Sequence, residues 1–377
     1  MRITILTSTR ADWGLLAPLA KALRAHGEEV SVVAANMHFM PQLGDTWREI
    51  AADGFDIARR ILPGATPADT AATTLRGVAE AMREIRPDCA VILGDRYEML
   101  AAATACTLER VPVVHIAGGA VSEGAFDDSF RHAITKLSTL HLTETEAYRR
   151  RVIQLGENPE AVINTGAIGL QAITGAEPMP LGELEESLRF SLSDPTLLVT
   201  MHAATLSPLP PERQIEELIA ALESRRALRV VFTHPNNDTD PAPLVARIEA
   251  FAARNPERVC TVPSLGARRY TSALHYVAAV VGNSSSGIVE APSAGIPTLD
   301  IGIRQRGRTA ADSVVHCGNT AQEIAEGLDR ILDPAFRRAA RQTVNPYYRP
   351  DTTGTMVRAI TEFRFHEHSY KRFHDLH

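Results

Sequence analysis

Short apolar runs alternate with helix-length segments along the whole chain. The runs of the first half are ITILT, VSVVAA, CAVILGD, VPVVHIAGG, LHLTET and AVINTG, and those of the second half are TLLVTMH, LRVVFTHP, VCTVPS, AVVGNSSSG and PTLDIG. They are continuously apolar rather than alternating, which is typical of strands buried on both faces of a parallel sheet. The pattern therefore predicts an α/β protein with two doubly wound sheets.

The stretch between the two halves differs from both in composition. Residues 173–187, ITGAEPMPLGELEES, are rich in Gly, Pro and Glu and show no apolar periodicity, so we place a domain linker there. A chain of 377 residues also exceeds what one hydrophobic core usually supports. We expect an N-terminal domain over 1–172, a C-terminal domain over 188–345 and a closing segment over 346–377.

Composition and charge narrow the function classes. With 45% hydrophobic residues, 22% charged residues and a net charge of −6, the chain is typical of a globular protein without a nucleic-acid surface. No apolar run reaches the ~18 residues that span a bilayer, and the first residues lack a secretion signal. The four cysteines (Cys89, Cys106, Cys260 and Cys317) show no CxxC spacing, so we expect reduced thiols in a cytoplasmic protein.

Four polar clusters follow predicted strands, and open parallel sheets bind ligands at the carboxyl ends of their strands. The first cluster is TSTRADWGLL, in which we interpret Asp12 as a helix N-cap and Arg10 as an anion-binding candidate. The second is VILGDRYEML. There, either Asp95 caps a helix with Arg96 as its surface ion pair, or Asp95 holds a substrate hydroxyl or moves a proton.

The third cluster, HIAGGAVSEGAFDDSFRH, concentrates acids and bases after another predicted strand. Its titratable side chains are His115, Glu123, Asp127, Asp128, Arg131 and His132. Asp127 and Arg131 are four residues apart and would share one helix face, where the simplest interpretation is a surface ion pair. A metal site is disfavoured, because the two histidines lack helical ligand spacing and no HExxH or CxxC motif accompanies them.

The fourth cluster, VVGNSSSGIVEAPSAGIP, predicts a phosphate site between a strand and a helix. Small residues there leave backbone amides free for phosphate; they are Gly282, Asn283, Ser284, Ser285, Ser286 and Gly287. Glu290 follows one helical turn after Ser286, where its carboxylate can accept both hydroxyls of a ribose. Positive charge comes from DIGIRQRGR, with Arg304, Arg306 and Arg308. Together they predict a nucleotide diphosphate site that is neither a Walker loop nor GxGxxG.

Six motifs occur in order from about Arg2 to about Arg349: RADWG, GDRYE, RHAITKLSTLH, RRRVIQLGE, GNSSSGIVEAPSAGIPTLDIG and RQRGR. In these motifs the chain closely resembles the UDP-N-acetylglucosamine 2-epimerases of sialic and legionaminic acid biosynthesis. The resemblance implies the GT-B fold, with two Rossmann-like domains and a sugar nucleotide in the cleft. It also implies a C-terminal helix, DTTGTMVRAITEFRFHEHSYKRF, that crosses back to the first domain. Non-hydrolysing members carry the motif HVEAG where this chain has HIAGG, so the chain looks like the hydrolysing branch.

The resemblance implies a two-stage reaction on UDP-N-acetylglucosamine or UDP-2,4-diacetamido-2,4,6-trideoxyglucose. A base removes the proton at C2 while UDP leaves C1, and water then adds to the 2-acetamidoglucal to give the free manno sugar. The expected partner is the UDP-sugar alone, without cofactor, metal, nucleic acid or membrane, in a homodimer or homotetramer. The substituents at C4 and C6, and the choice of UDP or GDP, stay open.

Site residues carry over from the family's motifs one position at a time. Asp95 and Asp127 match catalytic carboxylates, Arg131 a neighbouring support and His38 a sugar-side histidine. Nucleotide-binding positions are matched by Arg10, Arg96, His202, Ser284, Ser285, Ser286, Gly287, Glu290 and Arg304.

One position departs from the family pattern. Hydrolysing relatives have a catalytic Glu where this chain has Ala120, and an alanine methyl cannot carry a proton. Three explanations stay open: an engineered inactivating substitution, relocation of the role to Glu123, or a divergent member with other chemistry. The alternative function is accordingly a GT-B glycosyltransferase or a nucleotide-sugar binder that has lost turnover.

Overall fold

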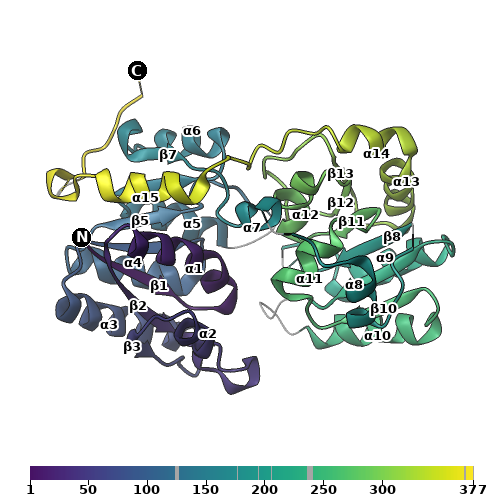
Figure 1. The fold of residues 1–377 in the computed structure, drawn as a ribbon, viewed down its shortest axis with the longest axis horizontal. Coiled ribbons are helices and arrows are strands. Elements are labelled where there is room, and N and C mark those ends of the chain that lie inside the picture. Colours follow the sequence, from purple (N-terminus) through teal and green to yellow (C-terminus); the bar gives the residue numbers. More distant parts are fainter. Residues whose placement is uncertain are drawn as a thin grey trace. The chain divides into compact units, whose positions relative to one another are not determined.

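The computed structural model describes residues 1–123, 127–175, 177–193, 195–204, 206–235, 241–368 and 371–376. Its contacts divide the chain into two compact units. Unit 1 comprises Met1–Ala120, Asp127–Ile168 and Arg349–His377, and unit 2 comprises Val121–Phe126 and Gly169–Tyr348. Each unit is a parallel sheet flanked by helices (Figure 1).

The sheet of unit 1 has seven parallel strands in the order β3-β2-β1-β4-β5-β6-β7. The strands are β1 (Arg2–Thr7), β2 (Glu29–Ala35), β3 (Ile57–Ile61), β4 (Cys89–Leu93), β5 (Val113–Ile116), β6 (Leu140–Thr143) and β7 (Val162–Asn164). The helices are α1 (Arg10–Ala25), α2 (Trp47–Ala52), α3 (Pro67–Ile85), α4 (Tyr97–Leu108), α5 (Asp127–Leu137), α6 (Glu146–Gln154) and α15 (Thr352–Glu362). The winding direction reverses between β1 and β4, so ligands are expected where these strands end.

The sheet of unit 2 has six parallel strands in the order β10-β9-β8-β11-β12-β13. The strands are β8 (Thr196–Thr200), β9 (Arg229–Thr233), β10 (Val259–Val262), β11 (Ala279–Gly282), β12 (Thr298–Ile301) and β13 (Val314–Cys317). The helices are α7 (Leu170–Gly175), α8 (Leu181–Leu188), α9 (Pro211–Glu223), α10 (Ala242–Arg254), α11 (Gly266–Ala273), α12 (Ser285–Val289), α13 (Ala321–Leu332) and α14 (Pro334–Ala340), with a 3-10 turn, η4 (Ala291–Ala294). Here the reversal lies between β8 and β11.

Every apolar run singled out in the sequence is a strand, which confirms the two doubly wound sheets. The sequence missed β3 and β13, which are both edge strands. Edge strands carry polar side chains, and Arg59, Arg60 and His316 break the apolar pattern of these two. Most of α8 falls within the stretch 173–187 that we expected to be a linker, and this helix buries Leu184 and Leu188.

The C-terminal helix packs on unit 1. Asp351 caps α15 by accepting the Gly354 N–H at 3.1 Å, and Met356 and Ile360 are fully buried in the same core as Trp13 of α1. The helix ends at Glu362, well short of the predicted segment's end at residue 373. Apolar burial against α1 therefore holds the last helix to the first unit.

The cysteines are free thiols in the structure. Cys89 and Cys106 are buried as core residues, whereas Cys260 and Cys317 are half-buried. Burial raises the pKa of Cys106 to about 12, which keeps that thiol protonated and unreactive. Across the described ranges, no helix is both long and apolar enough to span a membrane.

Candidate functional site

In unit 1, a buried arginine joins the loop after β4 to the start of α5. Arg131 is only 2% exposed; its guanidinium donates to the Asp95 carboxylate, to Asp128 Oδ1 at 2.8 Å and to the Ala120 carbonyl at 3.0 Å. Asp95 follows Gly94, whose φ of +80° turns the chain sharply after β4. One desolvated cation thus orients two partly exposed carboxylates.

His115, on β5, forms a hydrogen bond with the turn that precedes Asp95. The ring is fully buried, and its Nε2 lies 2.8 Å from the Gly94 carbonyl, to which it must donate because a carbonyl only accepts. Burial lowers the pKa of His115 to about 3, so the ring is neutral near pH 7. The sequence suggested His115 only as a metal ligand, a role that its spacing disfavoured. In the structure, His115 holds Gly94, the residue that precedes Asp95.

Asp128 is the residue of this region that sequence reasoning named but did not place in the site. It lies three residues before Arg131, and its other oxygen lies 3.5 Å from His132 Nε2. Burial lowers the pKa of His132, which is half-buried. Asp127, predicted to share a face with Arg131, lies half-buried in the first turn of α5. The (i, i+3) spacing was the signal that could have identified Asp128.

The first cluster differs from the prediction in its cap. The N-cap of α1 is Thr9, and Asp12 is its partner three residues on: Asp12 accepts the Thr9 N–H at 3.0 Å while the Asp12 N–H donates back to Thr9 at 3.1 Å. The prediction of Asp12 as N-cap was therefore wrong, because the reciprocal capping box satisfies two amides at once. Arg10 is exposed and pairs with Glu49 at 2.9 Å.

Arg96 and His38 are held by neighbours in unit 1. The N-cap of α4 is Arg96 rather than Asp95, so the helix-cap interpretation of Asp95 was wrong; Arg96 pairs with Glu98 at 3.1 Å. His38 is fully buried, with Nε2 3.0 Å from the Thr7 hydroxyl and Nδ1 2.9 Å from that of Thr46. Burial lowers the pKa of His38 to about 4, so it is a neutral, packed ring.

Ala120 and Glu123 have contrasting surroundings. Ala120 is 2% exposed and follows Gly119, where a Cβ would meet the Tyr148 carbonyl oxygen at 2.5 Å with φ at +82°. Glu123 lies in the segment assigned to unit 2, has a half-exposed side chain and pairs with Arg306 at 3.3 Å. The alanine is therefore part of a tightly packed turn, whereas the glutamate is a partly solvated ion-pair partner.

In unit 2, hydrogen bonds of Asn283 join the chain that follows β11 to the chain that follows β8. Gly282 has φ at +129°, and a Cβ there would lie 1.9 Å from the Thr200 carbonyl oxygen, so only glycine fits. Asn283 is buried and accepts the His202 N–H at 2.7 Å while donating to the His202 carbonyl at 2.9 Å. Asn283, which the prediction treated only as a small residue, thus fixes the backbone that carries His202.

The serine-rich loop begins directly after this clamp. Ser284 is the N-cap of α12 and accepts the Ser286 hydroxyl at 3.0 Å, and all three serines are half-exposed. Gly287 lies against Thr298, whose methyl a Cβ would meet at 2.8 Å. Arg304 Nη1 donates to the Asn283 carbonyl at 3.1 Å, which brings a guanidinium to the loop.

Glu290 ends α12, with its N–H donating to the Ser286 carbonyl at 2.8 Å. Burial raises the pKa of Glu290 to about 7. The buried Tyr270 hydroxyl of α11 lies beside Glu290 and Ser286, although not in good hydrogen-bonding orientation to either. Tyr270 was absent from the prediction, because a lone tyrosine on a helix has no motif.

Metal ligation finds no support in this geometry. Over the residues with a described position, no group of three His, Cys, Asp or Glu side chains comes together in a way that could hold a metal ion.

Two doubly wound α/β units, each with polar groups at its switch point, are the architecture of GT-B enzymes, as the sequence predicted. The chain belongs to the UDP-N-acetylglucosamine 2-epimerase family, whose model matches residues 21–361.

Two of three relatives at 30–31% identity carry 2-epimerase names. The chain is 30% identical to the GDP/UDP-N,N'-diacetylbacillosamine 2-epimerase (hydrolyzing) of Campylobacter jejuni, with 89% of each chain covered. It is 31% identical to the UDP-N,N'-diacetylbacillosamine 2-epimerase (hydrolyzing) of Legionella pneumophila, covering 88% of this chain and 89% of the relative. It is also 31% identical to the Escherichia coli polysialic acid biosynthesis protein P7, covering 100% and 97%.

Solved structures share the fold. The complex of S. aureus MnaA with UDP has a TM-score of 0.77 at 16% identity, with 99% of each chain covered. The Neisseria meningitidis UDP-GlcNAc 2-epimerase bound to UDP-GlcNAc has a TM-score of 0.72 at 16% identity, covering 96% of this chain and 100% of that one.

Proposed function

We propose that the protein is a hydrolysing 2-epimerase that converts a UDP-2-acetamido sugar to UDP and the free manno-configured sugar. The observation that carries this proposal is the Asp95–Arg131–Asp128 cluster at the switch point of unit 1. Proton transfer at a sugar carbon needs a carboxylate whose position is fixed, and a buried guanidinium supplies that restraint.

Unit 2 would bind the nucleotide. Half-exposed serines on the loop after β11 can donate to a diphosphate, and Arg304 adds positive charge beside them. The Glu290 carboxylate can accept the hydroxyls of the ribose. Two solved structures of the same fold contain UDP or UDP-GlcNAc, which supports a nucleotide-sugar ligand for this chain.

In the proposed reaction, Asp95 and Asp127 are the acid and base groups, as the family's motifs imply; Asp127 lies next to Asp128 in the first turn of α5. One carboxylate removes the C2 proton as the C1–oxygen bond breaks and UDP departs with the electron pair. Water then adds its hydroxyl at C1, and C2 receives a proton from the opposite face, which inverts that centre. Arg131 acts as the positioning residue, because it donates to Asp95 and to Asp128. His115 holds the Gly94 carbonyl, and His38 is held between the hydroxyls of Thr7 and Thr46.

Ala120 leads us to propose slow turnover for the chain as written. Its methyl group is buried in the turn after β5 and offers no proton. Glu123 has a half-exposed side chain that pairs with Arg306, and it is not part of the cluster that the buried Arg131 holds. We therefore propose that Glu123 does not replace the missing group, which the Glu123→Gln variant tests.

The sugar carries a 2-acetamido group, and the relatives at 30% and 31% identity are named for a diacetamido substrate. We accordingly include the 2,4-diacetamido-2,4,6-trideoxy sugar beside N-acetylglucosamine. The UDP form of each is incubated with the protein, without an acceptor, and followed by NMR. Free manno sugar with an equal amount of UDP supports the proposal. A mixture that stays inert with both substrates, or release of the unchanged gluco sugar, contradicts it.

A further inference from the structure

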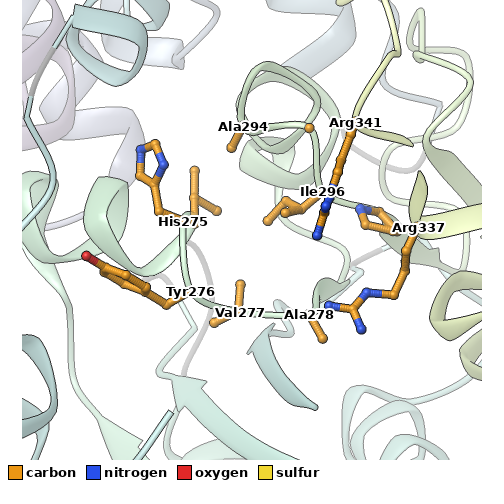
Figure 2. Close-up of a pocket in the computed structure, with 11 residues that line it drawn as sticks. His275, Tyr276, Val277, Ala278, Ala294, Ile296, Arg337 and Arg341 are labelled. Carbon is orange, nitrogen blue, oxygen red and sulfur yellow. The ribbon is translucent and has the colours of Figure 1, made fainter. Parts of the chain in front are cut away.

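Basic side chains gather in both units. In unit 2, Arg341 and His275 line a cavity of about 400 Å³, but both are exposed to solvent (Figure 2). In unit 1, Lys136 and Lys371 converge on Glu157, whose side chain is only 2% exposed. An exposed cation needs no fixed partner, whereas a carboxylate is buried only where cations or hydrogen bonds offset its lost hydration. The cluster around Glu157 is therefore a specific feature of the fold.

Lysine is rare in this chain, which makes the convergence informative. Of the 39 lysine and arginine residues, only three are lysines: Lys21, Lys136 and Lys371. Two of these three meet at Glu157, with Lys136 Nζ 2.6 Å from Oε1 and Lys371 Nζ 2.5 Å from Oε2. An ammonium donates three hydrogens around one nitrogen, whereas a guanidinium donates from a planar fork. A site that demands lysine is thus one where several acceptors surround a single point.

Lys371 meets that description, because each of its three hydrogens has an acceptor. Besides Glu157, the ammonium donates to the Lys136 carbonyl at 2.8 Å and to the Thr135 carbonyl at 3.3 Å. Both carbonyls belong to the last turn of α5, and the last carbonyls of a helix lack partners within the helix. Positive charge is also favourable at this end of the helix dipole. Lys371 therefore caps the carboxyl end of α5.

The tail, which we define as residues 371–376, has two further contacts with unit 1. The His374 N–H donates to the Gly156 carbonyl at 3.0 Å, and the Phe373 ring lies over Gly156, where it leaves no room for a Cβ. The Phe373 ring centre lies 5.1 Å from Lys136 Nζ, within the range of a cation–π interaction. Backbone and ring contacts thus hold the tail beside the end of α5.

Glu157 is ionised at the centre of the cluster. Burial alone would raise the pKa of Glu157, but hydrogen bonds from His141 and the two lysines lower it to about 2. His141 Nε2 lies 3.0 Å from Oε2 and donates to it, because an ionised carboxylate only accepts. Removing one donor from a buried carboxylate leaves that charge less compensated. Loss of the Lys371 ammonium should accordingly loosen both the tail and the end of α5.

Thr135 connects this cluster to the candidate site. Its carbonyl accepts from Lys371, and its hydroxyl lies 3.2 Å from Nδ1 of His115. The other ring nitrogen of His115 holds the Gly94 carbonyl, one residue before Asp95. Thr135 and His115 are both fully buried, so neither can move without displacing its neighbours. Two packed residues therefore lie between the ammonium and the turn that carries Asp95.

We propose that Lys371 is a positioning residue of the reaction proposed above, acting through Thr135 and His115 on the turn that carries Asp95. This role rests on the proposed function, because the placement of Asp95 affects the rate only if Asp95 transfers a proton. A misplacement of about 1 Å can lower the rate of such a step by ~10²-fold.

Hydrogen exchange of the full-length protein, followed by mass spectrometry over residues 94–99 and 127–137, tests the connection without turnover. Lys371→Met should exchange at least about tenfold faster in both segments, because hydrogen bonds from a charged donor are lost. Lys21→Met is the matched control, since it removes the remaining lysine, which pairs with Asp53 on a partly exposed surface, and should stay within about twofold. Lys371→Arg keeps the charge, but its planar fork does not match three acceptors around one nitrogen, so exchange should stay faster than in the wild type.

Turnover then separates positioning from folding. For release of UDP, kcat of Lys371→Met should fall about tenfold or more while KM stays within about threefold, and Lys21→Met should keep wild-type kinetics. Wild-type exchange over residues 94–99 in Lys371→Met or Lys371→Arg would overturn the proposal, and so would faster exchange with an unchanged kcat. A parent protein without turnover would refute the proposed function instead, and exchange would still decide whether Lys371 fixes the Asp95 turn.

Discussion

The two units hold the polar groups at their switch points in different ways. In unit 1, charge is balanced by charge, since the buried Arg131 holds both Asp95 and Asp128. In unit 2, neutral groups fix the backbone through Asn283, and Glu290 is a carboxylate whose pKa burial raises to about 7. The first arrangement depends on ion pairs, whereas the second contains a carboxylate that gains a proton as pH falls through about 7.

Removing the buried cation of unit 1 should be the most damaging change. Arg131→Leu leaves two partly exposed carboxylates and the Ala120 carbonyl without their shared donor, and the loss of such charge-assisted hydrogen bonds lowers the free energy of unfolding by about 1.5–3 kcal/mol. Urea denaturation of the variant measures the loss. Arg10→Gln, which removes an exposed arginine paired with Glu49, is the control and should change it by at most about 1 kcal/mol. Similar losses in both variants would contradict the contrast between buried and exposed pairs.

Asp95→Asn and Asp127→Asn should each lower turnover by ~10²-fold or more while UDP affinity is retained, because each removes a proton-transfer group rather than a nucleotide contact. Release of UDP from the UDP-sugar gives the rate, and calorimetry gives the affinity. Asp329→Asn changes an equally charged but exposed residue and serves as control. A wild-type rate in either variant removes that aspartate from the mechanism.

Ala120→Glu restores a carboxylate at the position where the family has one, and turnover should rise by ~10²-fold or more. Ala120→Gln, of equal size but unable to transfer a proton, should show no gain, and Glu123→Gln should leave the rate unchanged. The three rates are compared with the parent in one assay. Should Glu123→Gln be the damaging change instead, the catalytic role has moved to Glu123 and our interpretation of Ala120 is wrong.

A smaller effect tests the pH response of unit 2. The raised pKa means that Glu290 gains a proton as pH falls through about 7, and the protonated form loses acceptor capacity. Uridine, which has no phosphate to titrate in this range, should therefore bind more weakly from pH 7 to pH 5.5, by at most about tenfold per pH unit. Glu290→Gln should show weaker, pH-independent binding. NMR titration checks both, and a flat wild-type profile would exclude Glu290 from the ribose contact.

Local patterns predicted the strands and the loops that follow them, because burial on both faces gives continuous apolar runs. The pairing of Arg131 with Asp95, 36 residues away, could not be derived in the same way. Helical spacing instead favoured Asp127, since sequence reveals neighbours along a helix but not which strand end lies opposite. The same limit hid the clamp between Asn283 and His202, which are 81 residues apart.

Tyr270 shows a second kind of limit. Its hydroxyl is buried beside the Glu290 carboxylate, and a single tyrosine on an amphipathic helix does not reveal which residues surround its hydroxyl. The raised pKa of Glu290 is likewise a property of the packed loop. Sequence supplied the carboxylate, and the fold supplies its environment.

The proposed reaction requires the carboxylates of unit 1 to move a proton at C2 of the sugar. Turnover of UDP-N-acetylglucosamine in deuterium oxide, run with the Ala120→Glu variant as well as the parent, tests it directly. Elimination followed by rehydration must take the new C2 hydrogen from solvent, so the free manno sugar should carry deuterium at C2 by NMR and mass spectrometry. Free sugar that retains protium at C2 would contradict the account.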